Sequence, residues 1–264
     1  TGEGGSLFDF VCCFANISRG EVYDWLASFR NMVPESEYRA VIAPILQRPH
    51  HSSRIVIDSA SHQFTRYKLV DYAKSRAVSK EILEKYCEEV LYHVDSAPER
   101  QFYAIGFKNN SGGYVLRSSL SKKCSSSDIT TLGPDGQLTD KTSGNKVLVF
   151  EGFMDFLSWM TDVNQMTPDY DCCILNSVTN VTKALPWILQ HSNIAAFMDN
   201  DQAGKDTLQK IMESVPESAN DDVCVYDMSR LYEGYNDLNE KLSDELNNDN
   251  QPSINTKHHG TNII

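Results

Sequence analysis

The sequence predicts an α/β protein in which a parallel sheet flanked by helices follows an α+β part. Two observations predict this class. Between residues 147 and 246, short apolar strand-like runs alternate with helix-like segments, which is typical of a parallel sheet covered by helices. Between residues 101 and 120, two β-rich runs flank the turn-forming sequence Asn-Asn-Ser-Gly-Gly, which predicts a hairpin. The 264 residues could hold one large domain or two smaller ones.

The N-terminal part contains predicted helices on both sides of an irregular segment. Residues 7–29 carry apolar residues at the spacing of two short helices. Prolines interrupt residues 31–66, which we interpret as an irregular linker. Helical patterning returns in residues 68–76 and 79–92, and Ser79 is the expected N-cap of the latter helix.

Four strand–helix pairs make up the predicted parallel sheet. The strands are expected at 147–150, 172–175, 194–197 and 223–227. The helices that follow them begin near 153, cover 179–190, begin near 203 and cover 237–246. The remaining residues, 247–264, are polar and are expected to form a disordered tail.

Composition narrows the class of protein. Apolar residues make up 41% of the chain, which is enough for a buried core. No apolar run reaches the ~18 residues of a membrane span, and the first ten residues lack the pattern of a signal peptide. The seven cysteines lack C-x₂-C spacing, so we expect buried free thiols in a reducing cytoplasm.

The net charge of −12 argues mildly against tight, non-specific binding to nucleic acid. It leaves room for a local basic patch. Acids gathered around metal ions would also make the net charge more negative.

Carboxylates follow the predicted strands at the sheet edge where open parallel sheets bind ligands. The residues found there are Glu151, Gly152 and Asp155; Asn176 and Ser177; Asp199 and Asp201; and Asp237. Up to five carboxylates would therefore converge, and their mutual repulsion makes such a cluster unfavourable without cations. Oxygen-only ligands suit a hard ion such as Mg²⁺. Asp199 and Asp201 alternate on an extended chain, so both can bind one ion, while Gly152 and Gly204 allow close approach.

Each acid also has an ordinary structural explanation. Asp155 lies near a helix start and Asp237 just before one, where an acid often caps the helix. A D-x-D sequence in a loop is usually a turn. The joint pattern, E-G-x-x-D after one strand and D-x-D after another in one parallel unit, favours metal binding.

The motif "EGFMD" followed by "MDNDQAGKD" resembles the TOPRIM fold, and in particular the DnaG-type bacterial primases and their phage and mobile-element relatives. The resemblance implies a Rossmann-like sheet with two Mg²⁺ or Mn²⁺ ions. Carried over by position, the metal-binding residues are Glu151, Asp199, Asp201 and Asp237, the first three of them catalytic. Asp155 completes the E-G-x-x-D signature, and Asn176 and Ser177 occupy a small-residue loop beside the metals.

Two further segments resemble parts of these primases. "AIGFKNNSGGYVLRS" and the lysine-bearing loop after it are similar to the basic strand region that precedes TOPRIM. There the positive residues contact template and nucleotide, which implies that role for Lys108, Arg117, Lys122 and Lys123, although each could equally be a solvated hairpin residue. Residues 1–30 resemble the end of the primase zinc-binding domain without its ligands. Cys12 and Cys13 are poor substitutes, so we expect no zinc.

The resemblance divides the chain into five parts. These are a helical zinc-domain remnant at 1–30, a linker at 31–66, an N-terminal subdomain with the basic hairpin at 67–146, a TOPRIM domain at 147–246 and the tail at 247–264.

The implied function is the catalytic core of a DNA primase, a nucleotidyltransferase that makes short RNA primers from NTPs on single-stranded DNA. We expect a cytoplasmic monomer of mobile-element type, with a replicative helicase as a further potential partner. One alternative is a metal-dependent TOPRIM nuclease, which would need no NTPs; the basic strand region argues against it. The other is an inactive nucleic-acid-binding module of a mobilisation or replication complex, which the net charge favours and the intact acid set opposes.

Overall fold

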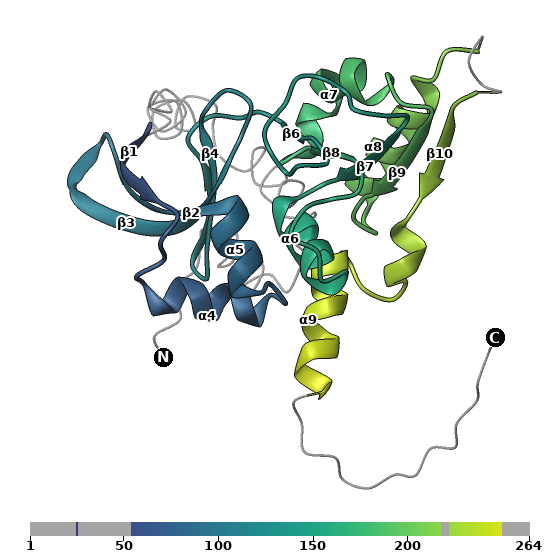
Figure 1. Ribbon diagram of the computed structural model, residues 1–264. Helices are drawn as coiled ribbons and strands as arrows, with labels where there is room; N and C mark the ends of the chain where they lie inside the picture. The colour runs from purple at the N-terminus through teal and green to yellow at the C-terminus, as the bar shows by residue number, and fades with distance from the viewer. Residues whose placement is uncertain (1–24, 26–53, 218–221, 250–264) are drawn as a thin grey trace, which may run out of the picture. The chain divides into compact units, whose positions relative to one another are not determined.

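The computed structural model describes residues 25, 54–217 and 222–249 (Figure 1). The predictions for the zinc-domain remnant, for Cys12 and Cys13, for most of the linker and for the tail after residue 249 lie outside the described residues. Residues 54–217 and 222–249 contain two five-stranded sheets and six α-helices. The α/β class is therefore confirmed.

The first sheet is an antiparallel meander with the strand order β1-β2-β3-β4-β5. Its strands are β1 (Ile55–Ser61), β2 (Cys87–Val94), β3 (Ala97–Lys108), β4 (Tyr114–Ser118) and β5 (Ser121–Cys124). The predicted hairpin is β3 and β4. Its turn is closed by two hydrogen bonds, because the Asn109 amide donates to the Gly113 carbonyl and the Gly113 amide donates to Asn109 Oδ1, each at 2.9 Å.

Two predictions for the N-terminal part were wrong. Strand β1 lies inside the range expected to be irregular, and β2 replaces the second half of the helix expected at 79–92. Helix α4 spans Tyr67–Ser75, and helix α5 (Lys80–Tyr86) begins at the expected cap, Ser79, but ends at Cys87. The reason is non-local: β2 pairs with β1 on one side and β3 on the other. Sheet pairing therefore overrides the local helical pattern.

The second sheet has the strand order β10-β9-β7-β8-β6. Its strands are β6 (Thr130–Leu132), β7 (Lys146–Phe150), β8 (Asp171–Ile174), β9 (Asn193–Phe197) and β10 (Cys224–Asp227). Helices α6 (Phe153–Asp162), α7 (Val181–Ile188), α8 (Gln202–Glu213) and α9 (Leu238–Asp249) follow β7, β8, β9 and β10. The four predicted strands are parallel to one another. Strand β6 pairs antiparallel with β8 at the edge of the sheet, and it was not predicted because it has only three residues.

Aromatic packing fixes the strand and helix that flank the acid motif. Phe150 at the end of β7 stacks on Phe197 at the end of β9, with ring centroids 4.7 Å apart. Phe153 in the first turn of α6 stacks on Phe107 of the antiparallel sheet at 5.0 Å. All four rings are buried in one hydrophobic cluster. The segment between β7 and α6 is therefore held at both ends by buried aromatic rings.

The cysteines are free thiols in the described residues, but they are not all buried. Cys87, Cys172 and Cys173 are buried, as expected, whereas Cys124 and Cys224 are exposed. Both exposed cysteines lie on edge strands, which have a neighbouring strand along only one of their two edges. Among the described residues, no helix has the length and apolar character needed to cross a bilayer.

Candidate active site

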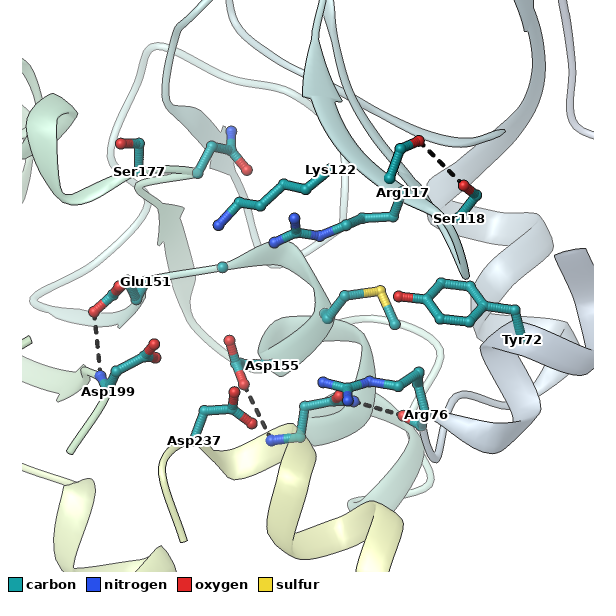
Figure 2. Close-up of a pocket in the computed structure, with 15 residues that line it drawn as sticks. Tyr72, Arg76, Arg117, Ser118, Lys122, Glu151, Asp155, Ser177, Asp199 and Asp237 are labelled. Carbon is teal, nitrogen blue, oxygen red and sulfur yellow. Dashed lines mark hydrogen bonds between the residues drawn. The ribbon is translucent and has the colours of Figure 1, made fainter. Parts of the chain in front are cut away.

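A polar cavity of about 280 Å³ lies at the carboxyl end of β7 (Figure 2). Four carboxylates line it, from Glu151, Asp155, Asp199 and Asp237. Three cationic side chains also line it, from Arg76, Arg117 and Lys122. In the described part of the chain, none of these cations forms an ion pair with any of these acids. The four carboxylates, called the acidic wall below, and the three cations, called the cationic wall, therefore line the same cavity without forming ion pairs with each other.

Strand pairing places Glu151 beside Asp199. The backbone N–H of Glu151 donates to the carbonyl of Phe197 at 3.1 Å, which continues the β7–β9 ladder by one residue. The backbone N–H of Asp199 donates to Glu151 Oε2 at 3.2 Å. Figure 2 shows this bond directing the Glu151 carboxylate toward the start of the D-x-D segment.

Burial and then the charges of neighbouring acids raise the pKa of three of these carboxyl groups, those of Glu151, Asp155 and Asp199. Burial is the main cause of the raised pKa of Asp199, which reaches about 7, and the charges of Glu151, Asp237 and Asp201 add to it. Burial also raises the pKa of Glu151, although the Asp199 amide partly opposes this. Asp155 is buried, and its pKa is raised first by burial and then by the charges of Asp237 and Asp199. The cluster therefore holds more negative charge than its surroundings compensate.

Two of the predicted acids also cap helices. Asp237 Oδ1 accepts the Glu240 amide at 2.6 Å at the start of α9, and its side chain lines the cavity. Asp201 Oδ1 accepts the Gly204 amide at 2.9 Å as the N-cap of α8. Asp201 does not line the cavity, so Asp199 and Asp201 do not face it together as the alternation suggested.

The glycines allow close approach, as the sequence suggested. A Cβ atom at Gly204 would lie 2.0 Å from the backbone oxygen of Asp199, so no larger residue fits without moving that segment. A Cβ atom at Gly152 would lie 3.1 Å from Asp155 Oδ2, which is tight but less severe. Gly204 thus supports the position of Asp199.

Of the four predicted basic residues, the structure places two at the cavity and two away from it. Arg117 and Lys122 are Cα partners across β4 and β5, so their side chains leave the same face and reach the cavity. Partial burial and then the charge of Arg117 lower the pKa of Lys122. Lys123 points to the opposite face, and Lys108 ends β3 near the Tyr114 ring. Neither Lys123 nor Lys108 lines the cavity.

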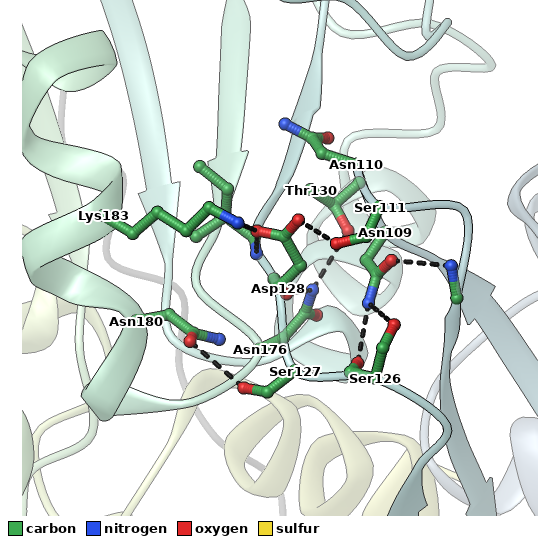
Figure 3. Close-up of polar contacts among 12 residues, drawn as sticks. Asn109, Asn110, Ser111, Ser126, Ser127, Asp128, Thr130, Asn176, Asn180 and Lys183 are labelled. Atoms are coloured by element: carbon green, nitrogen blue, oxygen red, sulfur yellow. Dashed lines mark hydrogen bonds and ion pairs between the residues drawn. The ribbon is translucent and has the colours of Figure 1, made fainter. Parts of the chain in front are cut away.

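The loop with Asn176 and Ser177 is anchored to Asp128 and to the first residue of β6. Asn176 has a left-handed backbone (φ 62°), and its Nδ2 donates to the Asp128 carbonyl and to Thr130 Oγ1, each at 3.0 Å. Asp128 in turn forms an ion pair with Lys183 of α7 (Figure 3). Both Asn176 and Ser177 line the cavity, and this polar network holds their loop there.

Sequence reasoning missed six of the residues that line the cavity, among them Arg76 and Asn239. Asn239 is buried in α9, and its Nδ2 donates to the Arg76 carbonyl and to Ser158 Oγ. Its backbone N–H donates to Asp155 Oδ1 at 3.1 Å. Arg76 ends α4, and its Nε is buried without a partner in the described residues. No sequence motif signals either residue.

The donor set fits a divalent cation. Only oxygen ligands are offered, as Mg²⁺ and Mn²⁺ prefer, and a bound cation would relieve the repulsion among the acids. The described residues contain no three His, Cys, Asp or Glu side chains already gathered tightly enough to form a metal site. The residues that could hold the ion are Glu151, Asp155, Asp199 and Asp237.

Comparison with protein-family models matches residues 148–242 to the family described as Toprim-like. Residues 148–242 form a Toprim-like domain. Such domains generally bind divalent metals, which agrees with the oxygen-only donor set. A second family model, described as Domain of unknown function (DUF8464), matches residues 58–126, which include the whole basic hairpin. The Toprim-like domain thus supplies the acidic wall and the preceding segment supplies Arg76, Arg117 and Lys122.

The solved structures that are similar to this chain include two from bacteriophage T7. The primase fragment of the bacteriophage T7 primase-helicase protein is 18% identical, with a TM-score of 0.45, and the match covers 72% of this chain and 77% of that chain. Primase domains from a bacteriophage T7 lagging-strand DNA polymerase complex with an RNA/DNA hybrid and dTTP are 19% identical, with a TM-score of 0.43, covering 66% and 85%. No curated protein matches the sequence.

Proposed function

We propose that this chain is the catalytic core of a DNA primase, which uses divalent metal ions and NTPs to make short RNA primers on single-stranded DNA. The observation that carries the proposal is the cavity itself. Its acidic wall comes from the Toprim-like domain and its cationic wall from the preceding subdomain. Nucleotidyl transfer needs both, because a triphosphate brings negative charge and metal ions to the reacting atoms.

The acidic wall would hold the metals. When bound, a divalent ion neutralises charge that develops on the transferring phosphoryl group. Glu151 is oriented by the Asp199 amide, and its raised pKa makes the ionised carboxylate a better acceptor for the proton of an attacking hydroxyl. Asp155 and Asp237 supply further oxygens from α6 and the start of α9.

The cationic wall would hold phosphates. Arg117 and Lys122 lie opposite each other across β4 and β5, an arrangement of like charges that is unfavourable unless an anion lies between them. Arg76 brings a partly unpaired guanidinium to the same cavity. Guanidinium groups bind phosphate oxygens with two parallel hydrogen bonds. These three residues therefore suit the phosphates of an NTP or of the template strand.

The full chain should be incubated with circular single-stranded DNA, labelled NTPs and Mg²⁺ or Mn²⁺. The proposal predicts short labelled RNA that requires DNA, NTPs and metal together. Cleavage of the DNA without NTPs would contradict it in favour of a metal-dependent nuclease. DNA binding with neither synthesis nor Mn²⁺ binding would contradict it in favour of an inactive nucleic-acid-binding module.

A further inference from the structure

Leu120 is the most exposed large apolar side chain in the described residues, with 94% of its surface accessible. A single exposed leucine is ordinary on a protein surface, so exposure alone says little. Its position is what sets it apart. Leu120 lies in the turn between β4 and β5, the hairpin that carries Arg117 and Lys122 into the cavity.

The turn holds Leu120 next to the cavity. Ser118 and Ser121 are the last Cα pair of the β4–β5 ladder, so only two residues form the tip. The two serine hydroxyls lie 3.2 Å apart, and the Leu120 amide donates to Ser118 Oγ at 3.3 Å. Ser118, Ser121 and the two cations beside them all line the cavity. A ligand that extends out of the cavity along this hairpin therefore meets Leu120.

The charge around the tip favours an anionic partner. Arg117, Lys122 and Lys123 all lie within three residues of Leu120, in a chain whose net charge is −12. A partner that combines an anionic backbone with apolar faces matches this combination of cations and one leucine. Unstacked nucleobases in a single strand expose such faces. Leucine is among the apolar side chains that proteins insert between the base steps of duplex DNA, so it can also pack against an exposed base.

We propose that Leu120 contacts an unstacked nucleobase of single-stranded DNA as the strand leaves the cavity. The inference rests on the proposed function, because that function brings a single-stranded template to the cavity. Lys122 and Arg117 would hold phosphates on the cavity side of the tip. The Leu120 side chain would pack against the face of the next base and keep that base from stacking on its neighbour.

Fluorescence anisotropy with labelled oligonucleotides tests this contact without catalysis. The full chain, Leu120→Ala and the control Leu138→Ala are titrated with an oligothymidine and with a strand of the same length that has abasic sites. Leu138 is an exposed leucine that lines a different hollow. Because Leu120 is almost fully exposed, its truncation should leave the circular dichroism spectrum and unfolding temperature unchanged.

Leu120→Ala should weaken oligothymidine binding by roughly 5-fold, because the apolar surface that packs on the base is lost, and should leave abasic binding unchanged. Leu138→Ala should change neither affinity. Equal effects of Leu120→Ala on both strands, no effect on either, or no binding of single-stranded DNA by the wild type would each overturn the inference. If primers are not made but binding depends on Leu120 in the expected way, the proposed function fails while the base contact stands.

Discussion

The backbone N–H of Asn239 donates to Oδ1 of Asp155 over 3.1 Å, which joins the start of α9 to the first turn of α6. The Asn239 side chain extends this link to α4, because its Nδ2 donates to the Arg76 carbonyl and to Ser158 Oγ. One buried residue thus connects the carboxylate of Asp155 with the backbone of Arg76, and both of these residues line the cavity.

Asn239→Ala should lower the free energy of unfolding by about 1–3 kcal/mol, because it leaves buried polar partners without a donor. Urea denaturation measures this change. Asn248→Ala is the matched control, since Asn248 is an exposed residue of the same helix. Equal stability of the two variants would mean that the Asn239 side chain does not hold α4 and α6 together.

Gly204→Ala should destabilise the protein although alanine normally favours helices. In an ordinary helix the change would stabilise by about 1 kcal/mol. Here the new Cβ atom would lie 2.0 Å from the Asp199 carbonyl oxygen, so the Asp199 segment must move. Thermal unfolding should show a lower Tm, and Gly144→Ala, whose Cβ meets nothing within 4 Å, should not. An unchanged or higher Tm for Gly204→Ala would show that the close approach is absent.

The metal-free protein should lose stability as pH rises from about 4 toward 8. Unfolded aspartates lose their protons near pH 3.9, whereas burial and neighbouring charges keep Asp199 protonated to about pH 7 and raise the pKa of Asp155 as well. The folded state binds more protons in this range, so raising the pH favours unfolding. Urea denaturation in EDTA at several pH values measures the slope.

Asp155→Asn tests the contribution of the Asp155 carboxyl group to this pH dependence. The side-chain oxygen of asparagine can still accept the hydrogen bond from the Asn239 backbone N–H. The variant should lose less stability than the wild type between pH 5 and pH 8, and Mn²⁺ should stabilise the wild type more at the higher pH. Parallel pH profiles for the two proteins would contradict the raised pKa of Asp155.

Lys122→Ala should weaken NTP use far more than Lys123→Ala. The two lysines are neighbours on β5, but only Lys122 lines the cavity. Loss of a charged hydrogen bond to phosphate corresponds to roughly a 10-fold or greater rise in KM for NTP. Steady-state primer synthesis at varied NTP concentration measures it. Similar KM values for both variants would remove Lys122 from the phosphate-binding wall.

The parts of the site that follow the strands of the parallel sheet could be predicted from sequence. Glu151 and Asp199 come directly after buried apolar runs, and parallel strands bring such positions to one edge regardless of the rest of the fold. The strand–helix alternation is a local pattern, so its boundaries could be read to within a few residues. Asp155 was harder to judge, because only its burial between α6 and α9 distinguishes it from an ordinary helix cap.

Other parts of the fold and of the site depend on contacts between residues far apart in the sequence, which no local sequence pattern predicts. Arg76 and Asn239 meet although 163 residues separate them in the chain. Strand β2 is a strand because β1 and β3 pair with both of its edges. Alternation predicts that Lys122 and Lys123 face opposite sides, but only the packing of the sheet decides which of them faces the acids.

If the cavity acids support template-directed nucleotide joining, removing the charge of one of them should slow primer synthesis. Primer synthesis by the full chain should be compared for the wild type, Asp199→Asn and the control Asp206→Asn, an exposed acid on α8. Asp199→Asn should lose on the order of 10²-fold or more in rate, whereas Asp206→Asn should keep the wild-type rate. Primers made by Asp199→Asn at the wild-type rate would contradict a catalytic role for the cavity acids.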